Sequence, residues 1–520
     1  MSQEQNQRLQ LLNSLLKTPH RDLSESYPIH QRILSEDPLF YVRLAAWYSK
    51  NGEIRDHEEL FVINLCLSDF EGHREVGLAM LRELPPRRVA NVVNFIKGHT
   101  IKTVVNSQGT GRKRRMSSVS KKIGLNRDIP RSLRTELRRY LRERELNDGW
   151  FDSSVAVARK YMRFLYRVAM RGITKDYDNP QLLTDRAKAI LFEDKPPADS
   201  SLFVIKNLNK LTDPIQQAKY IIEHKVPYRI ASTVIKQMTP TVLLALIEVM
   251  SDQELINSIG SLKRHGVFEN ADLKKLVNEK LQKAKKSKKG KVAALKSLEA
   301  VKAADVDGEI AESLKEVADK QLKAKGRITR PTALFVDKSS SMSGAIELGK
   351  RMGSLVSSVT DADFFCYAFD SMPYPIVSKG ETIADWEKAF SGVRASGMTS
   401  IGCPFKMMIK KKQYVEQVMI ITDEGETTSP AFLKSYREYV AAMNVEPSVF
   451  ILRTGSNRCK KVFEMLQRNG VEVEDYEIDE SDYYALPSLI KYLTKGTKLD
   501  LLMEVMGTDL PERKLEPALA

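Results

Sequence analysis

The sequence has few of the features that mark secreted, membrane or thiolate-metal proteins. Only four of its 520 residues are cysteine, and no two of them stand close together, which excludes a zinc knuckle and a redox pair. No apolar run approaches the roughly 20 residues that a membrane helix needs. The N-terminus, Met1–Lys17, is polar and lacks the apolar core of a secretory signal. We therefore expect a cytoplasmic protein that does not enter a membrane.

The usual signatures of an enzyme are also missing. The sequence contains no Gly-rich phosphate loop, no nucleophile elbow and no HExxH motif. Its seven histidines are dispersed, and the last of them is His265. A nucleophile in the C-terminal third, such as Ser341, would have no histidine near it in the sequence to serve as its base. We therefore predict that the chain is not an enzyme.

Positive charge is distributed unevenly along the chain, whose formal net charge is +15. Residues 331–520 carry 22 basic and 27 acidic side chains, so the other 60 basic and 40 acidic ones lie in residues 1–330. A body this basic favours a polyanionic partner, and the clustering of the basic residues favours nucleic acid. Solubility alone is the simpler alternative.

One basic cluster, Lys97–Arg144, has fifteen basic and three acidic residues. Its first half, Asn106–Asn126, sets the run Arg112–Arg115 among glycine and serine, which is typical of a mobile, solvated loop. We place this loop at about residues 106–127. A nuclear-localisation patch and a plain flexible arm are alternative interpretations.

Two predicted helices follow, and arginine recurs on each at every fourth position. Ser153–Lys175 contains no acidic residue that could neutralise its arginines. Like charges four residues apart destabilise an isolated helix. Such a row needs an anion, or carboxylates from neighbouring helices. Phosphate is the obvious anion because guanidinium binds it in a bidentate manner, and a structural salt-bridge network is the alternative. With the basic loop, the candidate RNA-binding residues are Arg112, Lys113, Arg114, Arg115, Lys121, Lys122, Arg134, Arg138, Arg142, Arg159, Arg163, Arg167 and Arg171.

The middle of the chain has a period of thirteen residues, set by Pro214, Pro227 and Pro240. Asp213 and Thr239 stand directly before two of these prolines, as helix caps do. The resulting helices are only about ten residues long, too short to bury their apolar faces alone, so they must stack on one another. The sequence predicts an all-α, HEAT-like helical-repeat array, arranged as a solenoid or a ring.

From Pro331 the pattern changes to alternating strands and helices. This alternation predicts a parallel, doubly wound, Rossmann-like α/β sheet, which binds ligands at the carboxyl ends of its strands. The strands that matter most here are the first and a later one, at Thr332–Val336 and Val418–Thr422.

Oxygen donors follow those two strands and the loop between them. Asp337, Ser339 and Ser341 come directly after the first strand, Asp423 ends the later one, and Thr399 lies in the intervening loop. Two carboxylates and three hydroxyls are hard ligands, suited to Mg²⁺ and unsuited to Zn²⁺. The sequence therefore predicts one divalent cation, Mg²⁺ before Mn²⁺ or Ca²⁺. An ordinary strand-ending turn is the alternative.

On these residues, the region 332–506 resembles a von Willebrand factor A domain with a metal-ion-dependent adhesion site. All five ligand positions match. The resemblance implies an open coordination position that an acidic group of a partner completes. Three charged residues stand beside these ligands and change the local charge: Lys338, between Asp337 and Ser339, and Glu424 and Glu426, after Asp423. They affect how tightly the site would bind a metal ion.

The helical part resembles the TROVE-domain family of Ro ribonucleoprotein autoantigens. The best match is Ala218–Ser261, with Ile222–Pro227, Met238–Pro240 and Leu243–Leu246; Ala311–Arg330 and, more loosely, Arg131–Tyr140 also match. The resemblance implies a ring that binds single-stranded RNA ends and structured Y-type RNA, and it transfers no RNA-contacting residue.

Together these features predict a monomeric RNA-binding scaffold of Ro type. It would bind non-coding or misfolded RNA and recruit an acidic protein partner or a nuclease through its metal. A metal-dependent protein-interaction adaptor with no RNA role is the alternative. The expected parts are a helical-repeat RNA-binding domain over 1–278, a Lys/Ala-rich helical connector over 279–330, a von Willebrand A-type domain over 331–506 and a tail over 507–520.

Overall fold

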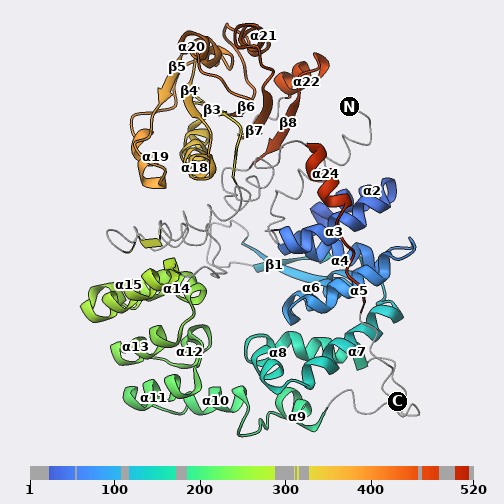
Figure 1. Cartoon of the computed structure of the whole chain (residues 1–520). Coiled ribbons are helices and arrows are strands. Elements are labelled where there is room, and N and C mark those ends of the chain that lie inside the picture. Colours follow the sequence, from blue (N-terminus) through green and yellow to red (C-terminus); the bar gives the residue numbers. More distant parts are fainter. Residues whose placement is uncertain are drawn as a thin grey trace. The chain divides into compact units, whose positions relative to one another are not determined.

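The structure is a computed structural model that divides into two compact units (Figure 1). The first, here called the helical unit, comprises Met1–Ser14, Pro19–Val249 and Leu502–Ala520. The second, here called the sheet unit, comprises Leu15–Thr18 and Met250–Leu501. The residues described are 23–52, 55–106, 116–170, 184–286, 310, 313–314, 327–454, 460–478 and 498–513.

The helical unit consists mainly of short helices joined by short connections. Its described elements are α2 (Leu23–Glu36), α3 (Pro38–Asn51), α4 (Arg55–Leu67), α5 (His73–Glu83), α6 (Pro86–Lys97), β1 (His99–Asn106), β2 (Met116–Ile123), α7 (Arg131–Glu145), α8 (Asp148–Met170), α9 (Asp185–Lys188), the π-helix η1 (Ala189–Glu193), α10 (Ser201–Leu208), α11 (Pro214–His224), α12 (Tyr228–Val234) and α13 (Pro240–Val249). Close packing partners include α4 with α5, α7 with α8, and α11 with α13.

Capping side chains explain where several of these helices begin. Asp213 accepts a hydrogen bond from the amide of Gln216 at 2.9 Å, and Thr239 accepts one from the amide of Val242 at 3.4 Å. Pro214 takes the first helical position, where its missing N–H costs nothing. These caps satisfy amides that no carbonyl within the helix can reach. The predicted array of short helices is confirmed here.

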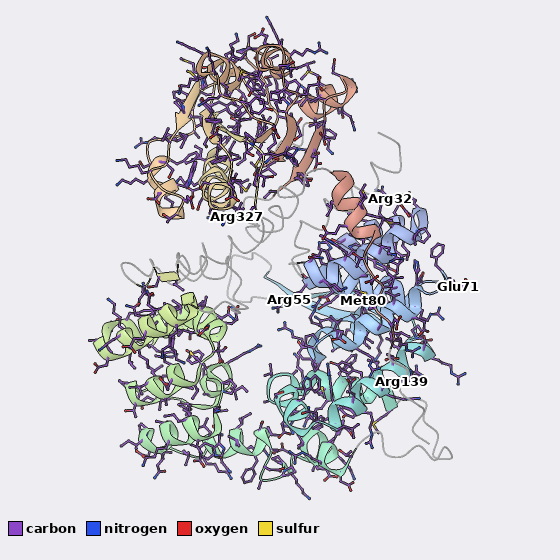
Figure 2. All side chains as sticks on the ribbon, in the orientation of Figure 1. Arg32, Arg55, Glu71, Met80, Arg139 and Arg327 are labelled. Atoms are coloured by element: carbon purple, nitrogen blue, oxygen red, sulfur yellow. The ribbon has the colours of Figure 1, made fainter. Side chains whose placement is uncertain are left out.

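Helix α4 is buried on nearly all sides and packs against α2, α3, α5 and α6. Its His57 is fully buried, with Nδ1 3.3 Å from Nε2 of His30, whose Nδ1 lies 2.9 Å from the Tyr41 hydroxyl. Among the labelled side chains of this unit, Met80 is buried and Glu71 is exposed (Figure 2). The core therefore contains a hydrogen-bonded polar cluster within apolar surroundings.

The expected basic loop at 106–127 is only partly a loop. Strands β1 and β2 form an antiparallel hairpin in which His99 pairs with Ile123 and Asn106 pairs with Met116. The β-branched Val119 and Ile123 of β2 favour a strand, a signal that the high charge of the segment obscures. Residues 107–115 lie outside the described part of the chain.

Residues 502–513 pack on α3, α5 and α7 of the helical unit. Helix α24 (Lys498–Met506) carries Glu504, which accepts a hydrogen bond from the Trp47 indole at 2.9 Å. Further on, Arg513 donates to Glu136 of α7 at 2.7 Å and to Glu75 of α5 at 2.8 Å. The residues that the sequence assigned to the end of the A-type domain and a tail thus belong, from Leu502 onward, to the helical unit.

The sheet unit begins with two helices and continues as an α/β fold. Its described elements are α14 (Asp252–Arg264), the 3₁₀ helix η2 (Val267–Glu269), α15 (Ala271–Lys286), β3 (Thr332–Asp337), α18 (Ser343–Val359), β4 (Phe364–Phe369), β5 (Pro373–Ile376), α19 (Ile383–Ala389), α20 (Cys403–Lys411), β6 (Gln417–Thr422), α21 (Phe432–Met443), β7 (Ser448–Arg453), α22 (Lys461–Arg468) and β8 (Val473–Glu477).

The strands form one sheet of order β5-β4-β3-β6-β7-β8, parallel except for the edge strand β5. Apolar side chains cover both faces, with α18 and α19 against one and α20, α21 and α22 against the other. Strands β3 and β6 are central and every residue in them is buried. They are neighbours but not consecutive, so the chain reverses its winding direction at their carboxyl ends, where such sheets bind ligands.

The predicted fold class, a helical-repeat part followed by a doubly wound α/β domain, is confirmed. The sequence did not predict β5 or α20, which are short and lie in a segment with weak periodicity. Among the residues described, no helix has the length and apolar character needed to cross a membrane.

Candidate functional site

The structure brings the predicted metal ligands of β3 and β6 together. Asp337 ends β3, and its carboxylate accepts hydrogen bonds from the Thr422 hydroxyl at 2.7 Å and from the Ser339 amide at 2.9 Å. Ser341, in the turn after β3, donates through its hydroxyl to Asp423 at 3.3 Å. Four of the five predicted ligands therefore lie at one corner of the sheet, as the order of the strands requires.

Thr399 belongs to a loop that is tied to both of its neighbours. The Thr399 carbonyl accepts hydrogen bonds from the amides of Thr427 and Thr428, each at 2.9 Å, in the segment after β6. Two residues earlier, the Gly397 carbonyl accepts a hydrogen bond from the Ser340 amide at 3.3 Å, in the turn after β3. The three loops that carry the predicted ligands are therefore held together by their backbones.

The chemistry of this corner fits a divalent cation. Asp337, Asp423, Ser339 and Thr399 are all buried, and the Ser339 hydroxyl makes no hydrogen bond of acceptable geometry to any described residue. Burial raises the pKa of Asp337, and the Asp423 carboxylate raises it further, although donors from Ser339 and Thr422 lower it. Buried like charges and an unsatisfied hydroxyl are costly unless a cation binds them.

The charged residues that could have disturbed the site are engaged elsewhere. The Lys338 ammonium lies 2.6 Å from Asp370. Glu424 accepts hydrogen bonds from the amides of Val462 and Phe463 at the start of α22, at 2.9 and 3.0 Å. A carboxylate is favoured at a helix N-terminus, which explains this position. Neither charge is free to compete for a bound cation.

Several of the candidate RNA-binding residues cannot be placed. Arg112–Arg115 and Arg171 lie outside the described residues, and Lys121 and Lys122 are described only as backbone in β2. The remaining candidates, on α7 and α8, are described with their side chains.

The arginines of α7 mainly serve the helical unit itself. Arg138 donates to the Ala169 carbonyl at 2.9 Å, Arg134 approaches the Ile129 carbonyl at 3.5 Å, and Arg142 lies 3.6 Å from Glu145. Burial and the neighbouring Arg134 lower the pKa of Arg138. A backbone carbonyl accepts a hydrogen bond from an arginine but does not neutralise the positive charge of its guanidinium group.

On α8, Arg159 obtains a carboxylate from a neighbouring segment, which is the second of the two alternatives that the sequence left open. Its guanidinium lies 2.9 Å from Asp194, which follows η1, and it also donates to the Ile190 carbonyl at 2.8 Å. Arg163 donates to the Leu191 carbonyl. The neighbouring segment thus supplies one carboxylate and two carbonyls, as the structural alternative expected.

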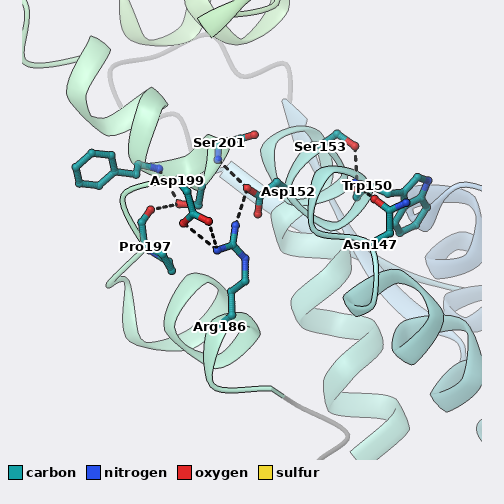
Figure 3. A network of polar contacts seen from close by, with 10 residues as sticks. Asn147, Trp150, Asp152, Ser153, Arg186, Pro197, Asp199 and Ser201 are labelled. Carbon is teal, nitrogen blue, oxygen red and sulfur yellow. Dashed lines mark hydrogen bonds and ion pairs between the residues drawn. The ribbon is translucent and has the colours of Figure 1, made fainter.

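A second ion-pair network holds that neighbouring segment in place. Arg186 of α9 lies 3.1 Å from Asp152 of α8 and 2.9 Å from Asp199 (Figure 3). Asp152 is buried and also accepts a hydrogen bond from the Ser201 amide at 3.0 Å. Arg159 and Arg163 therefore help to hold the neighbouring segment against α8, and both side chains remain partly exposed.

A different set of cations remains exposed on α6 and α8, and the sequence-based prediction missed most of it. Arg87 and Lys160 flank the Tyr161 ring, with their charged groups 5.9 and 5.1 Å from its centroid, and Lys97 lies 6.0 Å from that of Phe164. These three cations and Arg167 are exposed, and both rings are partly exposed. We call this set the α6–α8 face; a search for aromatics among basic residues, rather than for arginine spacing, would have found it.

Comparison with solved structures identifies a protein of the same fold. The Ro (RSR) protein of Deinococcus radiodurans matches with a TM-score of 0.59 and 14% sequence identity, over 90% of this chain and 93% of that one. At this identity the likeness concerns the fold alone, and it confirms the expected resemblance to Ro proteins at that level.

Two further structures match over about a third of the chain. They are a von Willebrand factor type A protein from Catenulispora acidiphila (13% identity, 32% of this chain and 43% of that one, TM-score 0.27) and the conserved hypothetical protein BatB from Bacteroides thetaiotaomicron (12%, 34% and 98%, 0.26). The sequence matches no family model and none of the curated proteins.

Proposed function

We propose that the chain is an RNA-binding scaffold of Ro type. Its helical unit binds non-coding or misfolded RNA, mainly through phosphates. Its sheet unit holds one divalent cation, Mg²⁺, whose open position accepts an acidic group of a protein partner. The proposal assigns no catalytic step to the chain.

The proposal that the chain binds RNA rests mainly on the α6–α8 face. Helix α6 contains no acidic residue, and α8 contains none after Asp152. Arg87, Lys160 and Arg167 are exposed on these two packed helices and form no ion pair with a described residue. Cations beside partly exposed aromatic rings suit a nucleic-acid strand, because phosphates bind the cations while bases stack on the rings.

The metal part rests on the donor set at the carboxyl ends of β3 and β6. Asp337, Ser339, Ser341, Thr399 and Asp423 would hold the cation. A bound Mg²⁺ supplies a Lewis-acidic position for an external carboxylate, while these residues fix its place and shield it from other charges.

RNA binding is tested by reversing the exposed cations, in the triple variant Arg87→Glu, Lys160→Glu, Arg167→Glu. We expect the affinity for a fluorescein-labelled single-stranded RNA to fall about tenfold or more, and the salt dependence of binding to weaken by about 0.7 in log–log slope for each phosphate that the variant no longer binds. The matched control reverses Lys406, Lys434 and Lys461, which are exposed in the sheet unit. Equal affinities of the two triple variants would refute the proposed surface.

The adaptor without an RNA role has one observation in its favour, the neutralisation of Arg159 by Asp194. The two functions differ in what co-purifies with the protein. The scaffold predicts an absorbance ratio, 260 to 280 nm, that decreases after RNase treatment, whereas the adaptor predicts no change.

A further inference from the structure

Lys338, which lies between the predicted ligands Asp337 and Ser339, is buried, which is rare for lysine. Its ammonium group lies 2.6 Å from an Asp370 carboxylate oxygen and 3.2 Å from the Ser396 hydroxyl. The ammonium also lies 4.9 Å from the centre of the Tyr374 ring. Lys338 therefore points away from the predicted ligands on either side of it and toward the end of β4.

Asp370, directly after β4, is fixed on several sides. It accepts hydrogen bonds from the Met372 amide at 2.8 Å and from the Tyr374 hydroxyl at 3.3 Å, in addition to the contact with Lys338. Gly397 packs so closely on it that a Cβ there would lie 3.0 Å from the Asp370 Cβ. The φ of Gly397 is +89°, so only glycine suits this position.

The loop with Thr399 is attached to this ion pair on both sides of the threonine. Before it, the Ser396 amide donates to the Lys338 carbonyl at 2.7 Å. After it, the Ser400 amide donates to the Asp370 carbonyl at 2.8 Å. The backbones of Lys338 and Asp370 thus help to set the position of Thr399, together with the amides of Thr427 and Thr428 that bind its carbonyl.

We propose that the Lys338–Asp370 ion pair is a positioning device for Thr399 that makes the cation site selective for small ions, Mg²⁺ over Ca²⁺. The inference rests on the proposed metal function and extends it. Mg²⁺ requires near-ideal octahedral geometry at about 2.1 Å, whereas Ca²⁺ accepts looser and more numerous oxygen ligands at about 2.4 Å. A ligand loop held on both sides meets the first requirement, and a loosened one costs Ca²⁺ less than Mg²⁺.

The test compares metal binding to full-length Lys338→Met and to the matched control Lys350→Met. Lys350 pairs with Glu347 on the outer side of α18, so its loss leaves the loops untouched. Titration calorimetry should show Mg²⁺ binding about tenfold weaker in Lys338→Met, with Ca²⁺ binding changed less than about threefold. An unchanged ratio of Mg²⁺ to Ca²⁺ affinity would overturn the proposal, because a merely structural role weakens both ions alike.

Lys338→Met leaves Asp370 buried without its counter-ion, so the double variant Lys338→Met, Asp370→Asn is measured as well. It removes both charges, keeps the packing, and should show the same selective loss of Mg²⁺. Hydrogen exchange of the amides in residues 396–400 is measured without metal. Faster exchange than in Lys350→Met supports the positioning role even if no ion binds to the unaltered chain, which would refute the metal function alone. Equal exchange rates refute the positioning role.

Discussion

Two carboxylates that share a buried corner of a protein repel each other unless a cation or a proton separates them. Asp337 is fully buried and Asp423 is 7% exposed, and the Ser341 hydroxyl contacts only the second. The sequence was sufficient to predict this grouping, because both carboxylates follow strands of a parallel sheet, whose carboxyl ends lie at one edge. It could not show that Lys338 is neutralised by Asp370, 32 residues further on, because the end of β4 comes close only in the folded sheet.

A single substitution distinguishes the contribution of the bound metal to stability from that of the protein fold itself. In Asp337→Asn the site loses one of its two carboxylates, so Mg²⁺ at about 100 times the dissociation constant of the unaltered chain should no longer add its roughly 2.7 kcal/mol to the free energy of unfolding. Without metal, the variant should be at least as stable as the unaltered chain, because the repulsion by Asp423 is relieved. Thermal unfolding with Mg²⁺ and with EDTA measures both effects.

The exposed Asp363→Asn provides the matched control, since Asp363 stands before β4, at the opposite end of that strand from the site. A metal-dependent stabilisation that persists in Asp337→Asn would contradict the ligand assignment.

At the scale of single elements, periodicity gave the helices but not the partners of their side chains. The row on α8 was correctly predicted as helical, yet Arg159 finds its counter-ion in Asp194, on a segment that follows a break in the described chain. The Arg163 guanidinium likewise donates a hydrogen bond to the Leu191 carbonyl of η1. Arginine spacing therefore marked an interface between helices, whereas exposure and aromatic neighbours mark the α6–α8 face.

The packing of α2 on α4 predicts a pH dependence of stability. Burial and the proximity of His57 hold the pKa of His30 well below its ordinary 6.5. Between that depressed value and 6.5 the unfolded chain binds a proton that the folded chain does not, so stability decreases as the pH falls. The decrease should be about 1.4 kcal/mol for each pH unit below 6.5, measured by urea unfolding.

His30→Gln should remove this part of the pH dependence. His224→Gln, at the exposed end of α11, should keep it. If both variants retain the slope of the unaltered chain, His30 is not the group responsible.

At the scale of the whole chain, the described contacts show that residues far apart in the sequence complete one unit. Arg513 forms ion pairs with Glu75 and Glu136 of the helical unit, and it lies 377 positions from Glu136 in the sequence. No pattern in the sequence predicts such a pairing, because the tail over 507–520 has no periodicity from which to infer it.

Arg513→Ala should destabilise the helical unit more than the neighbouring substitution Glu512→Ala. Glu136 is fully buried, and Arg82 and Arg139 remain near it only at 3.6 Å each. Removing Arg513 takes away the shortest ion pair of this buried carboxylate and leaves it with the two longer ones, so we expect a loss of about 2 kcal/mol in the free energy of unfolding. Glu512→Ala, at the exposed preceding position, should change the free energy of unfolding by less than about 0.5 kcal/mol.

The double variant Arg513→Ala, Glu136→Gln should recover much of the loss, because it also removes the buried negative charge of Glu136. Urea unfolding followed by tryptophan fluorescence measures all three, and an Arg513→Ala curve that coincides with that of Glu512→Ala would show that the end of the chain is not part of the helical unit in solution.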